Sequence, residues 1–320
     1  MSAPIALSCG EPAGIGPEIA VKAWQRLRAD LPFFWIGDPR HLPTGTPFQA
    51  ISAPDQAASV AATALPVLPL RFAQPSHAGQ PDAANAQGVV DAIALGVELV
   101  KSGAARAICT APIHKQALQD GAGFSYPGHT EFLAALDGGR DVVMMLACDL
   151  LRVVPATIHI PLKDVATALT PDLLESVLRI THDALIERFG IAAPRIAVAG
   201  LNPHAGEGGK MGYEELKLIA PLLDKLRAEG MTLSGPLPAD TMFHPAARAH
   251  YDAAVCMYHD QALIPIKTLD FDKGVNVTLG LSFTRTSPDH GTAFDIAGKG
   301  IANPSSLIEA LRMAARMTST

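Results

Sequence analysis

The sequence predicts an α/β protein with two α/β/α domains, and three observations support this. Short aliphatic and β-branched runs recur along the 320-residue chain, and longer amphipathic patterns separate them. The runs show little polar alternation, which is typical of strands in a mainly parallel sheet that helices cover on both faces. Hydrophobic residues make up 48% of the chain, enough for a large core and for one or two domains.

Eight runs are predicted strands because each is short and apolar and is followed by polar, glycine or proline residues. In chain order they are residues 5–9 (IALSC), 33–37 (FFWIG), 105–110 (ARAICT), 142–148 (VVMMLAC), 153–160 (VVPATIHI), 195–200 (RIAVAG), 253–258 (AAVCMY) and 275–281 (VNVTLGL). Residues 40–87, rich in Pro, Ala and Gln, have the weakest pattern and are expected to form surface connections with one short strand.

Four amphipathic patterns predict helices over residues 17–29, over 171–189, from about residue 213, and over 305–317. The first begins with Pro17, a residue that suits the first helical turn. Thr170 is expected to cap the second helix, and Gly190 follows its end. The alternation of strands and helices favours parallel pairing.

Charge and composition exclude several classes of partner. The formal net charge is −6 and only 5% of residues are aromatic, so neither a basic face nor a stacking platform for nucleic acid is evident. The four cysteines are widely spaced in apolar runs, which predicts buried thiols in a reducing compartment. The N-terminal segment lacks a basic, apolar leader, and no run reaches the roughly 18 apolar residues of a membrane span. We therefore expect a cytoplasmic protein that binds neither nucleic acid nor membrane.

Three histidines lie at or just after the ends of predicted strands: His159, His204 and His259. His204 stands in the glycine-rich stretch GLNPHAGEGGKMG, where flexible backbone can approach an ion closely. Ligands collect at the carboxyl ends of strands in such folds. Three imidazoles that leave one metal position open form a catalytic type of site. The residues alone leave open the alternative that these are ordinary turn or strand-end histidines.

Two carboxylates accompany the histidines. Asp260 directly follows His259, and Asp240 lies in the segment PADT. Either could orient an imidazole or act as a general base. The alternative is an ordinary role in turns and helix caps.

A second set of polar residues is a candidate anion site. Its members are two cations and three hydrogen-bonding side chains that follow or interrupt apolar runs: His129, Thr130, Lys267, Asn276 and Arg285. A phosphate held by such donors gains charge-assisted hydrogen bonds of about 1.5–3 kcal/mol each. Taken singly, Lys267 and Arg285 are also compatible with solvated surface charges.

The nucleotide-binding motifs are missing. The segment GEPAGIGPE lacks the third glycine of a dinucleotide fingerprint, and the chain has no phosphate-loop pattern. A standard Rossmann nucleotide site is therefore disfavoured.

As an ordered set, the motifs resemble the 4-hydroxythreonine-4-phosphate dehydrogenase family of pyridoxal phosphate biosynthesis. The resemblance covers nearly the whole chain and is weakest over residues 40–87. It rests on GEPAGIGPE, PIHK, GHTEFLA, HIPL, GLNPHAGEGG, GPLPADTMF, YHDQALIPIK and VNVTLGLSFTRTSPDHGTAFDIAGKG. The chain departs from the family pattern at Ser282, where many members have proline.

The resemblance implies a divalent metal (Zn, Mg or Co) on His159, His204 and His259. It implies a phosphorylated substrate on His129, Thr130, Lys267, Asn276 and Arg285, with NAD or NADP as oxidant. It also implies a fold similar to isocitrate and isopropylmalate dehydrogenases, with a cleft between a domain of residues 1–130 plus 286–320 and a second domain of residues 131–285. The second domain would carry much of the metal and substrate site.

The resemblance further implies a homodimer with the active site at the subunit interface, where His159 and His204 come from one subunit and His259 from the other. The implied reaction oxidises 4-hydroxythreonine 4-phosphate to a 3-oxo acid, which decarboxylates to 3-amino-2-oxopropyl phosphate. Three alternatives stay open: a related dehydrogenase of a four-carbon aldonate phosphate or an aromatic dihydrodiol, a non-catalytic two-domain protein that binds metal or phosphate, and an enzyme of acyl transfer to phosphate.

Overall fold

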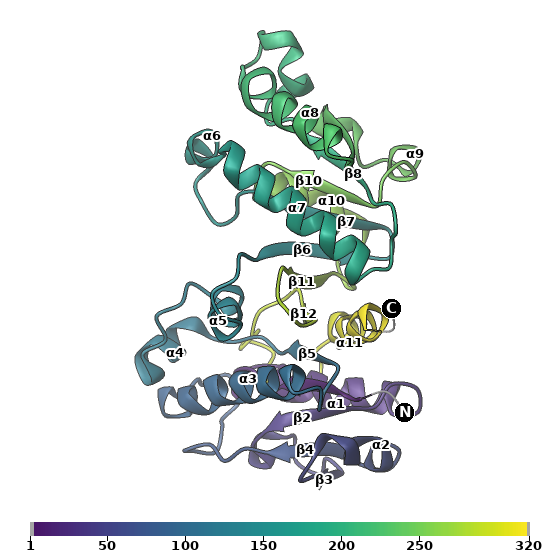
Figure 1. Ribbon diagram of the computed structural model, residues 1–320. Helices are drawn as coiled ribbons and strands as arrows, with labels where there is room; N and C mark the ends of the chain where they lie inside the picture. The colour runs from purple at the N-terminus through teal and green to yellow at the C-terminus, as the bar shows by residue number, and fades with distance from the viewer. Residues whose placement is uncertain (1–2, 319–320) are drawn as a thin grey trace. The chain divides into compact units, whose positions relative to one another are not determined.

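The computed structural model describes residues 3–318, and the chain forms two compact units (Figure 1). Unit 1 combines residues 3–140 with 281–318, and unit 2 is residues 141–280. The sequence-based boundaries lie at 130/131 and 285/286, so they assign Arg285 to the second domain. In the structure Arg285 belongs to unit 1.

The sheet of unit 1 is parallel throughout. Its strands are ordered β3 (Phe48–Ala50), β4 (Leu65–Pro69), β2 (Phe33–Gly37), β1 (Ile5–Ser8), β5 (Ala107–Thr110) and β12 (Arg285–Pro288). Every residue of β1, β2 and β5 is buried, as the absence of polar alternation in these segments predicts.

Unit 1 also contains α-helices. They are α1 (Gly16–Leu27), α2 (Ala57–Val60), α3 (Ala86–Lys101), α4 (Lys115–Ala122), α5 (His129–Leu136) and α11 (Ser305–Met317). Helix α3 packs against β1, β2 and β5. By length and composition, the helical stretch Ala83–Lys101 is apolar enough to cross a membrane. One face of this stretch, with Val89, Ile93 and Val97, is buried in the core of unit 1.

Unit 2 has a mixed sheet. Its strands are ordered β11 (Val275–Leu279), β6 (Val143–Cys148), β7 (Leu151–Pro155), β10 (Ala253–Cys256), β8 (Arg195–Ala199) and β9 (Thr232–Leu237). Strand β6 is antiparallel to β7 and β11, whereas β7, β10, β8 and β9 pair in parallel. The helices are α6 (Val165–Ala168), α7 (Pro171–Glu187), α8 (Ala220–Ala228), α9 (Pro245–Arg248) and α10 (His259–Leu269).

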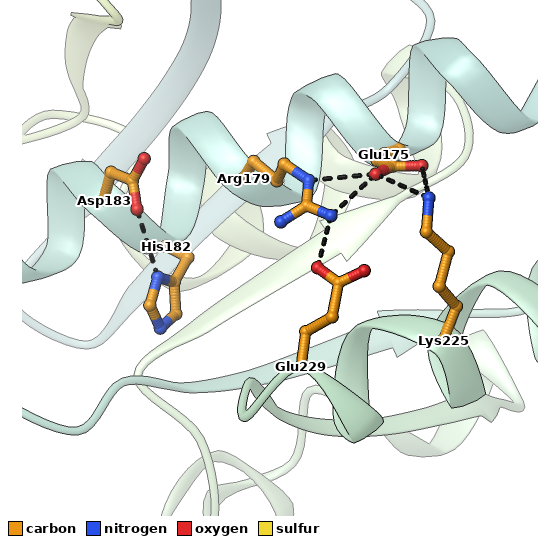
Figure 2. A network of polar contacts seen from close by, with 6 residues as sticks. All are labelled: Glu175, Arg179, His182, Asp183, Lys225 and Glu229. Atoms are coloured by element: carbon orange, nitrogen blue, oxygen red, sulfur yellow. Dashed lines mark hydrogen bonds and ion pairs between the residues drawn. The ribbon is translucent and has the colours of Figure 1, made fainter.

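Ion pairs join α7 to α8 and to Glu229, the residue that follows α8 (Figure 2). Arg179 donates to Glu175 at 2.7 Å and to Glu229 at 2.5 Å, and Lys225 donates to Glu175 at 2.8 Å. A single exposed pair stabilises little, but this network shares one carboxylate between two cations. It holds the start of α7 beside α8, the helix that follows the His204 loop in the chain.

Seven of the eight predicted runs contain a strand, and the run 153–160 overlaps β7 at residues 153–155. Thr170 caps α7 as expected, accepting from the Leu173 N–H at 3.2 Å. The run 153–160 is corrected, because β7 ends at Pro155 and the chain then leaves the sheet. Residues 40–87 contain two strands, β3 and β4, where one was expected. The sequence also missed β9 and β12, whose polar, glycine and proline residues hide the strand pattern.

Asp137, at the end of α5, has a side chain that is only 2% exposed. It accepts from the Ser282 N–H at 2.6 Å and the Ser282 hydroxyl at 2.5 Å, and it pairs with Lys101 at 3.2 Å. A proline at position 282 would supply neither Ser282 donor. Burial raises the pKa of Asp137, but these hydrogen bonds and the Lys101 charge outweigh burial, so the pKa lies below its usual value.

We predict that Asp137→Asn lowers stability at neutral pH. The asparagine NH₂ group is itself a donor, so it cannot accept the hydrogen bonds that Ser282 and Lys101 donate to the carboxylate. A carboxyl with a lowered folded-state pKa stabilises the fold above its unfolded pKa of about 3.9, and this contribution is lost as the pH falls through the folded value. Unfolding temperatures measured from pH 7 to pH 3 should therefore fall more steeply for wild type than for Asp137→Asn. Asp141→Asn, a control at an exposed carboxylate, should follow wild type. If the unfolding temperatures of Asp137→Asn instead fell in parallel with those of wild type, the lowered pKa assigned to Asp137 would be wrong.

Candidate functional site

His159 and His259 lie side by side because the strands that precede them are paired. Strand β7 pairs in parallel with β10, and Pro155 lies opposite Cys256. Beyond the strands, the Thr157 N–H and hydroxyl donate to the Met257 carbonyl at 3.2 and 2.7 Å. The two imidazole centroids are 5.6 Å apart.

This separation fits a shared metal ion. Two imidazoles that bind one ion through nitrogens at about 2.0–2.1 Å place their ring centroids about 5–6 Å apart. Both rings line a pocket of about 260 Å³ in unit 2. Its lining residues are Thr157, Ile158, His159, Ile160, Leu162, Val165, Tyr258, His259 and Asp260.

Asp260 is placed to orient His259. The Nδ1 atom of His259 shares a hydrogen bond of 2.7 Å with Asp260 Oδ1. A carboxylate on one imidazole nitrogen is the usual support of a metal-binding histidine, because it leaves the other nitrogen to the ion. Asp240 lies with Asp260 in the lining of a second, more apolar pocket of about 460 Å³, which also includes Tyr258 and Ile264.

His204 lies in a left-handed turn within the segment Pro203–Gly209. Residues 204–208 all have positive φ, from 42° to 76°. His159 also has positive φ, at 49°. Left-handed backbone is costly for residues other than glycine, and such strain concentrates at functional sites. Two of the three predicted metal ligands therefore have a backbone that needs support from their surroundings.

Within residues 3–318, no group of three or more His, Cys, Asp or Glu side chains could hold a metal ion. One chain thus brings His159 and His259 together as a pair and does not bring all three predicted ligands to one point.

In unit 1 the buried side chains of Arg285 and Thr110 are hydrogen-bonded, and the half-buried His129 lies near enough to be affected by the Arg285 charge. Arg285 is 3% exposed and donates to the Thr110 hydroxyl at 2.7 and 3.2 Å. Burial lowers the pKa of Arg285 to about 10. His129 Nε2 is buried and has no hydrogen-bond partner among residues 3–318. Burial, together with the Arg285 charge, holds the pKa of His129 well below its usual value. A bound anion would relieve the desolvation cost of these side chains.

The remaining predicted substrate residues are more dispersed. Thr130 follows His129 in the first turn of α5. Lys267 is in the last turn of α10, with Nζ 5.7 Å from the Phe271 ring centroid, and Asn276 is in β11 of the same unit. The sequence missed Thr110, although its place at the end of a predicted strand was a usable signal.

Gln261 was also missed, and it links two histidine segments. Its Nε2 donates to the Gly200 carbonyl at 2.8 Å, and its Oε1 accepts from the Met257 N–H at 2.7 Å. Gly200 begins the His204 loop, whereas Met257 precedes His259. The Gln261 side chain, on α10, therefore fixes Gly200, at the start of the segment that carries His204, relative to Met257, just before His259.

We predict that Gln261→Leu destabilises the protein, because it leaves a buried N–H and a buried carbonyl unsatisfied at about 1–3 kcal/mol each. Urea unfolding measures the change. Gln87→Leu, which removes an exposed amide that donates to Asp91, should stay within about 0.5 kcal/mol of wild type. Equal losses in the two variants would show that the link does not stabilise the fold.

Comparison with known proteins finds one matching family model and closely similar relatives of one description. The model of the pyridoxal phosphate biosynthetic protein PdxA matches residues 32–314. The 4-hydroxythreonine-4-phosphate dehydrogenase of Ruegeria sp. (strain TM1040) is 69% identical over 316 residues, which is 99% of this chain and 97% of the relative. The protein of the same description from Paracoccus denitrificans (strain Pd 1222) is 61% identical over 318 residues, which is 98% of this chain and 97% of the relative.

Two solved structures of different description match almost the whole chain. The crystal structure of 4-hydroxythreonine-4-phosphate dehydrogenase from Klebsiella pneumoniae superposes with a TM-score of 0.91 at 38% identity, covering 100% of this chain and 99% of the other. A terephthalate 1,2-cis-dihydrodiol dehydrogenase from Burkholderia xenovorans LB400 gives a TM-score of 0.69 at 30% identity, covering 99% of this chain and 98% of the other.

Proposed function

The chain belongs to the PdxA family of pyridoxal phosphate biosynthetic proteins, and we propose that it oxidises 4-hydroxythreonine 4-phosphate with NAD or NADP. The substrate's carbinol carbon gives a hydride to the nicotinamide and its hydroxyl gives a proton to a base. The resulting 3-oxo acid loses CO₂ and leaves 3-amino-2-oxopropyl phosphate. The observation that carries the proposal is 69% identity to a dehydrogenase of this description over 99% of the chain.

The residues of unit 2 fit a divalent metal. His159, His204 and His259 would hold it, since the first and third are 5.6 Å apart and Asp260 supports the third. Imidazole donors suit Zn or Co better than Mg, which prefers carboxylate and water ligands. When bound, the ion would supply Lewis acidity toward the substrate oxygen. Because Asp260 is engaged with His259, Asp240 is the carboxylate that takes the hydroxyl proton.

The phosphorylated end of the substrate is bound by His129, Thr130, Lys267, Asn276 and Arg285. The buried Arg285 and the enclosed His129 Nε2 support this assignment, because both gain from a nearby anion. The same residues favour a phosphorylated substrate over an aromatic dihydrodiol, the substrate that the Burkholderia xenovorans relative's description names.

An assay of NAD and NADP reduction tests the proposed activity. The panel is 4-hydroxythreonine 4-phosphate, erythronate 4-phosphate and an aromatic dihydrodiol, with coenzyme A and an acyl phosphate as the acyl-transfer arm. We expect reduction with the first compound, sensitive to chelators. Turnover of none of the substrates by metal-loaded protein would favour a binding protein, and chelator-insensitive, coenzyme A-dependent turnover would favour acyl transfer.

We predict that Lys267→Ala reduces kcat/KM for the phosphorylated substrate roughly 10- to 100-fold, because about 1.5–3 kcal/mol of charge-assisted binding is lost. The dephosphorylated substrate should be turned over equally by variant and wild type. Lys273→Ala removes an exposed lysine six residues further along the chain and serves as the control. If Lys267→Ala discriminates between the two substrates as strongly as wild type does, Lys267 does not bind the phosphate.

A homodimer with the metal site at the subunit interface is supported by exposed apolar side chains beside the ligand segments. Ile160 and Leu162 follow His159, Met211 and Tyr213 follow the His204 turn, and Ile264 is on the helix of His259; these side chains are 39–70% exposed. A second chain would bury them. Since His159 and His259 are paired in one chain, His204 is the ligand that the partner supplies, rather than His259.

Subunit mixing tests this assignment. His159→Ala mixed with His204→Ala should recover about a quarter of wild-type activity, because half of the random pairs are heterodimers with one intact site. His159→Ala mixed with His259→Ala should stay at background, because every site then lacks a ligand. The opposite pattern would show that His159 and His204 come from one subunit, and no recovery in any heterodimer would place all three ligands in one chain.

A further inference from the structure

The carboxylate of Glu215 lies inside the loop that carries His204. Glu215 is 2% exposed and begins a short π-helical turn, Glu215–Ile219. Its Oε1 accepts from the Asn202 N–H at 2.7 Å, and its Oε2 accepts from the Asn202 side-chain amide at 3.0 Å. Both carboxylate oxygens therefore bind the residue that directly precedes the left-handed turn.

The glycines of the loop allow this close approach. A Cβ atom at Gly206, where φ is +76°, would lie 2.6 Å from Glu215 Oε2. At Gly200 a Cβ would lie 3.1 Å from Glu215 Oε1 and 2.8 Å from the Ala205 Cα. The backbone of the loop thus folds around the carboxylate, which explains two of the glycines around His204.

The turn that this carboxylate supports is strained. His204, Ala205 and Glu207 are non-glycine residues with φ of 51°, 51° and 42°. Such backbone persists only where the surroundings fix it. Glu215 contacts the turn on both sides of His204, at Asn202 before it and at Gly206 after it.

We infer that Glu215 is a positioning residue for His204: its carboxylate holds the left-handed turn and so fixes the direction of the imidazole toward the metal. It acts through the loop and does not touch substrate. The inference rests on the proposed function, in which His204 is a metal ligand.

Co²⁺ titration of the metal-free protein, followed by visible absorbance and chelator competition, tests the inference. Glu215→Gln keeps the size of the side chain but turns an amide group toward a donor. We expect about 10-fold weaker Co²⁺ binding, in line with the loss of a group that supports a metal ligand. In the His204→Ala background the same substitution should leave Co²⁺ affinity unchanged, because the group it positions is gone.

Two further variants keep the test decisive. Gly206→Ala places a methyl group against the Glu215 carboxylate and should weaken Co²⁺ binding even if Glu215→Gln does not fold. Glu18→Gln is the matched control: Glu18 is a buried carboxylate of unit 1 that accepts from the N–H groups of Gly300 and Ala302. It should lower the unfolding temperature and leave Co²⁺ affinity unchanged.

The outcomes separate the two levels of the proposal. If His204→Ala loses affinity while folded Glu215→Gln and Gly206→Ala bind Co²⁺ within two-fold of wild type, the positioning role is wrong. If Glu215→Gln weakens binding equally with and without His204, its effect does not pass through His204 and the inference fails. If His204→Ala itself keeps full affinity, the metal assignment fails, and the inference fails with it.

Discussion

The parallel pairing of β7 with β10 is the constraint on which the candidate metal site depends. Because Pro155 and Cys256 are opposite each other, the segments that follow β7 and β10 leave the sheet at the same edge. The Thr157–Met257 hydrogen bonds continue the pairing into the loops, and His159 and His259 then meet at 5.6 Å. The pairing of these two histidines is thus a consequence of strand register, which no local motif in either segment encodes.

In unit 1, strand register also places the candidate anion-binding residue Arg285. Arg285 pairs with Ile108 in the β12–β5 register, which brings its guanidinium within reach of Thr110. Taking this cation out of water costs free energy, and the bonds to the Thr110 hydroxyl offset part of that cost. The phosphorylated substrate proposed above would add charge-assisted hydrogen bonds to Arg285.

The sequence predicted the α/β fold because the runs that form the buried strands are continuously apolar. It could not predict β12, whose residues RTSP lack that pattern and are recognised as a strand only through their neighbour β5. It identified His159, His204 and His259 by their place after strands, but not the left-handed backbone of His159 and His204, which no residue type announces. Nothing in the sequence distinguishes Glu215 from Glu214; only the folded loop encloses the one and leaves the other partly exposed.

We have proposed that His159, His204 and His259, all residues of unit 2, bind one metal ion. Anomalous diffraction at the zinc edge, from crystals of the Zn-loaded protein, tests it most directly. We expect one ion per chain, bound by the imidazole nitrogens of His159, His259 and His204, with His204 contributed by the second subunit. An ion held mainly by carboxylates, or one bound to His159 and His259 with no His204 nearby, would contradict it.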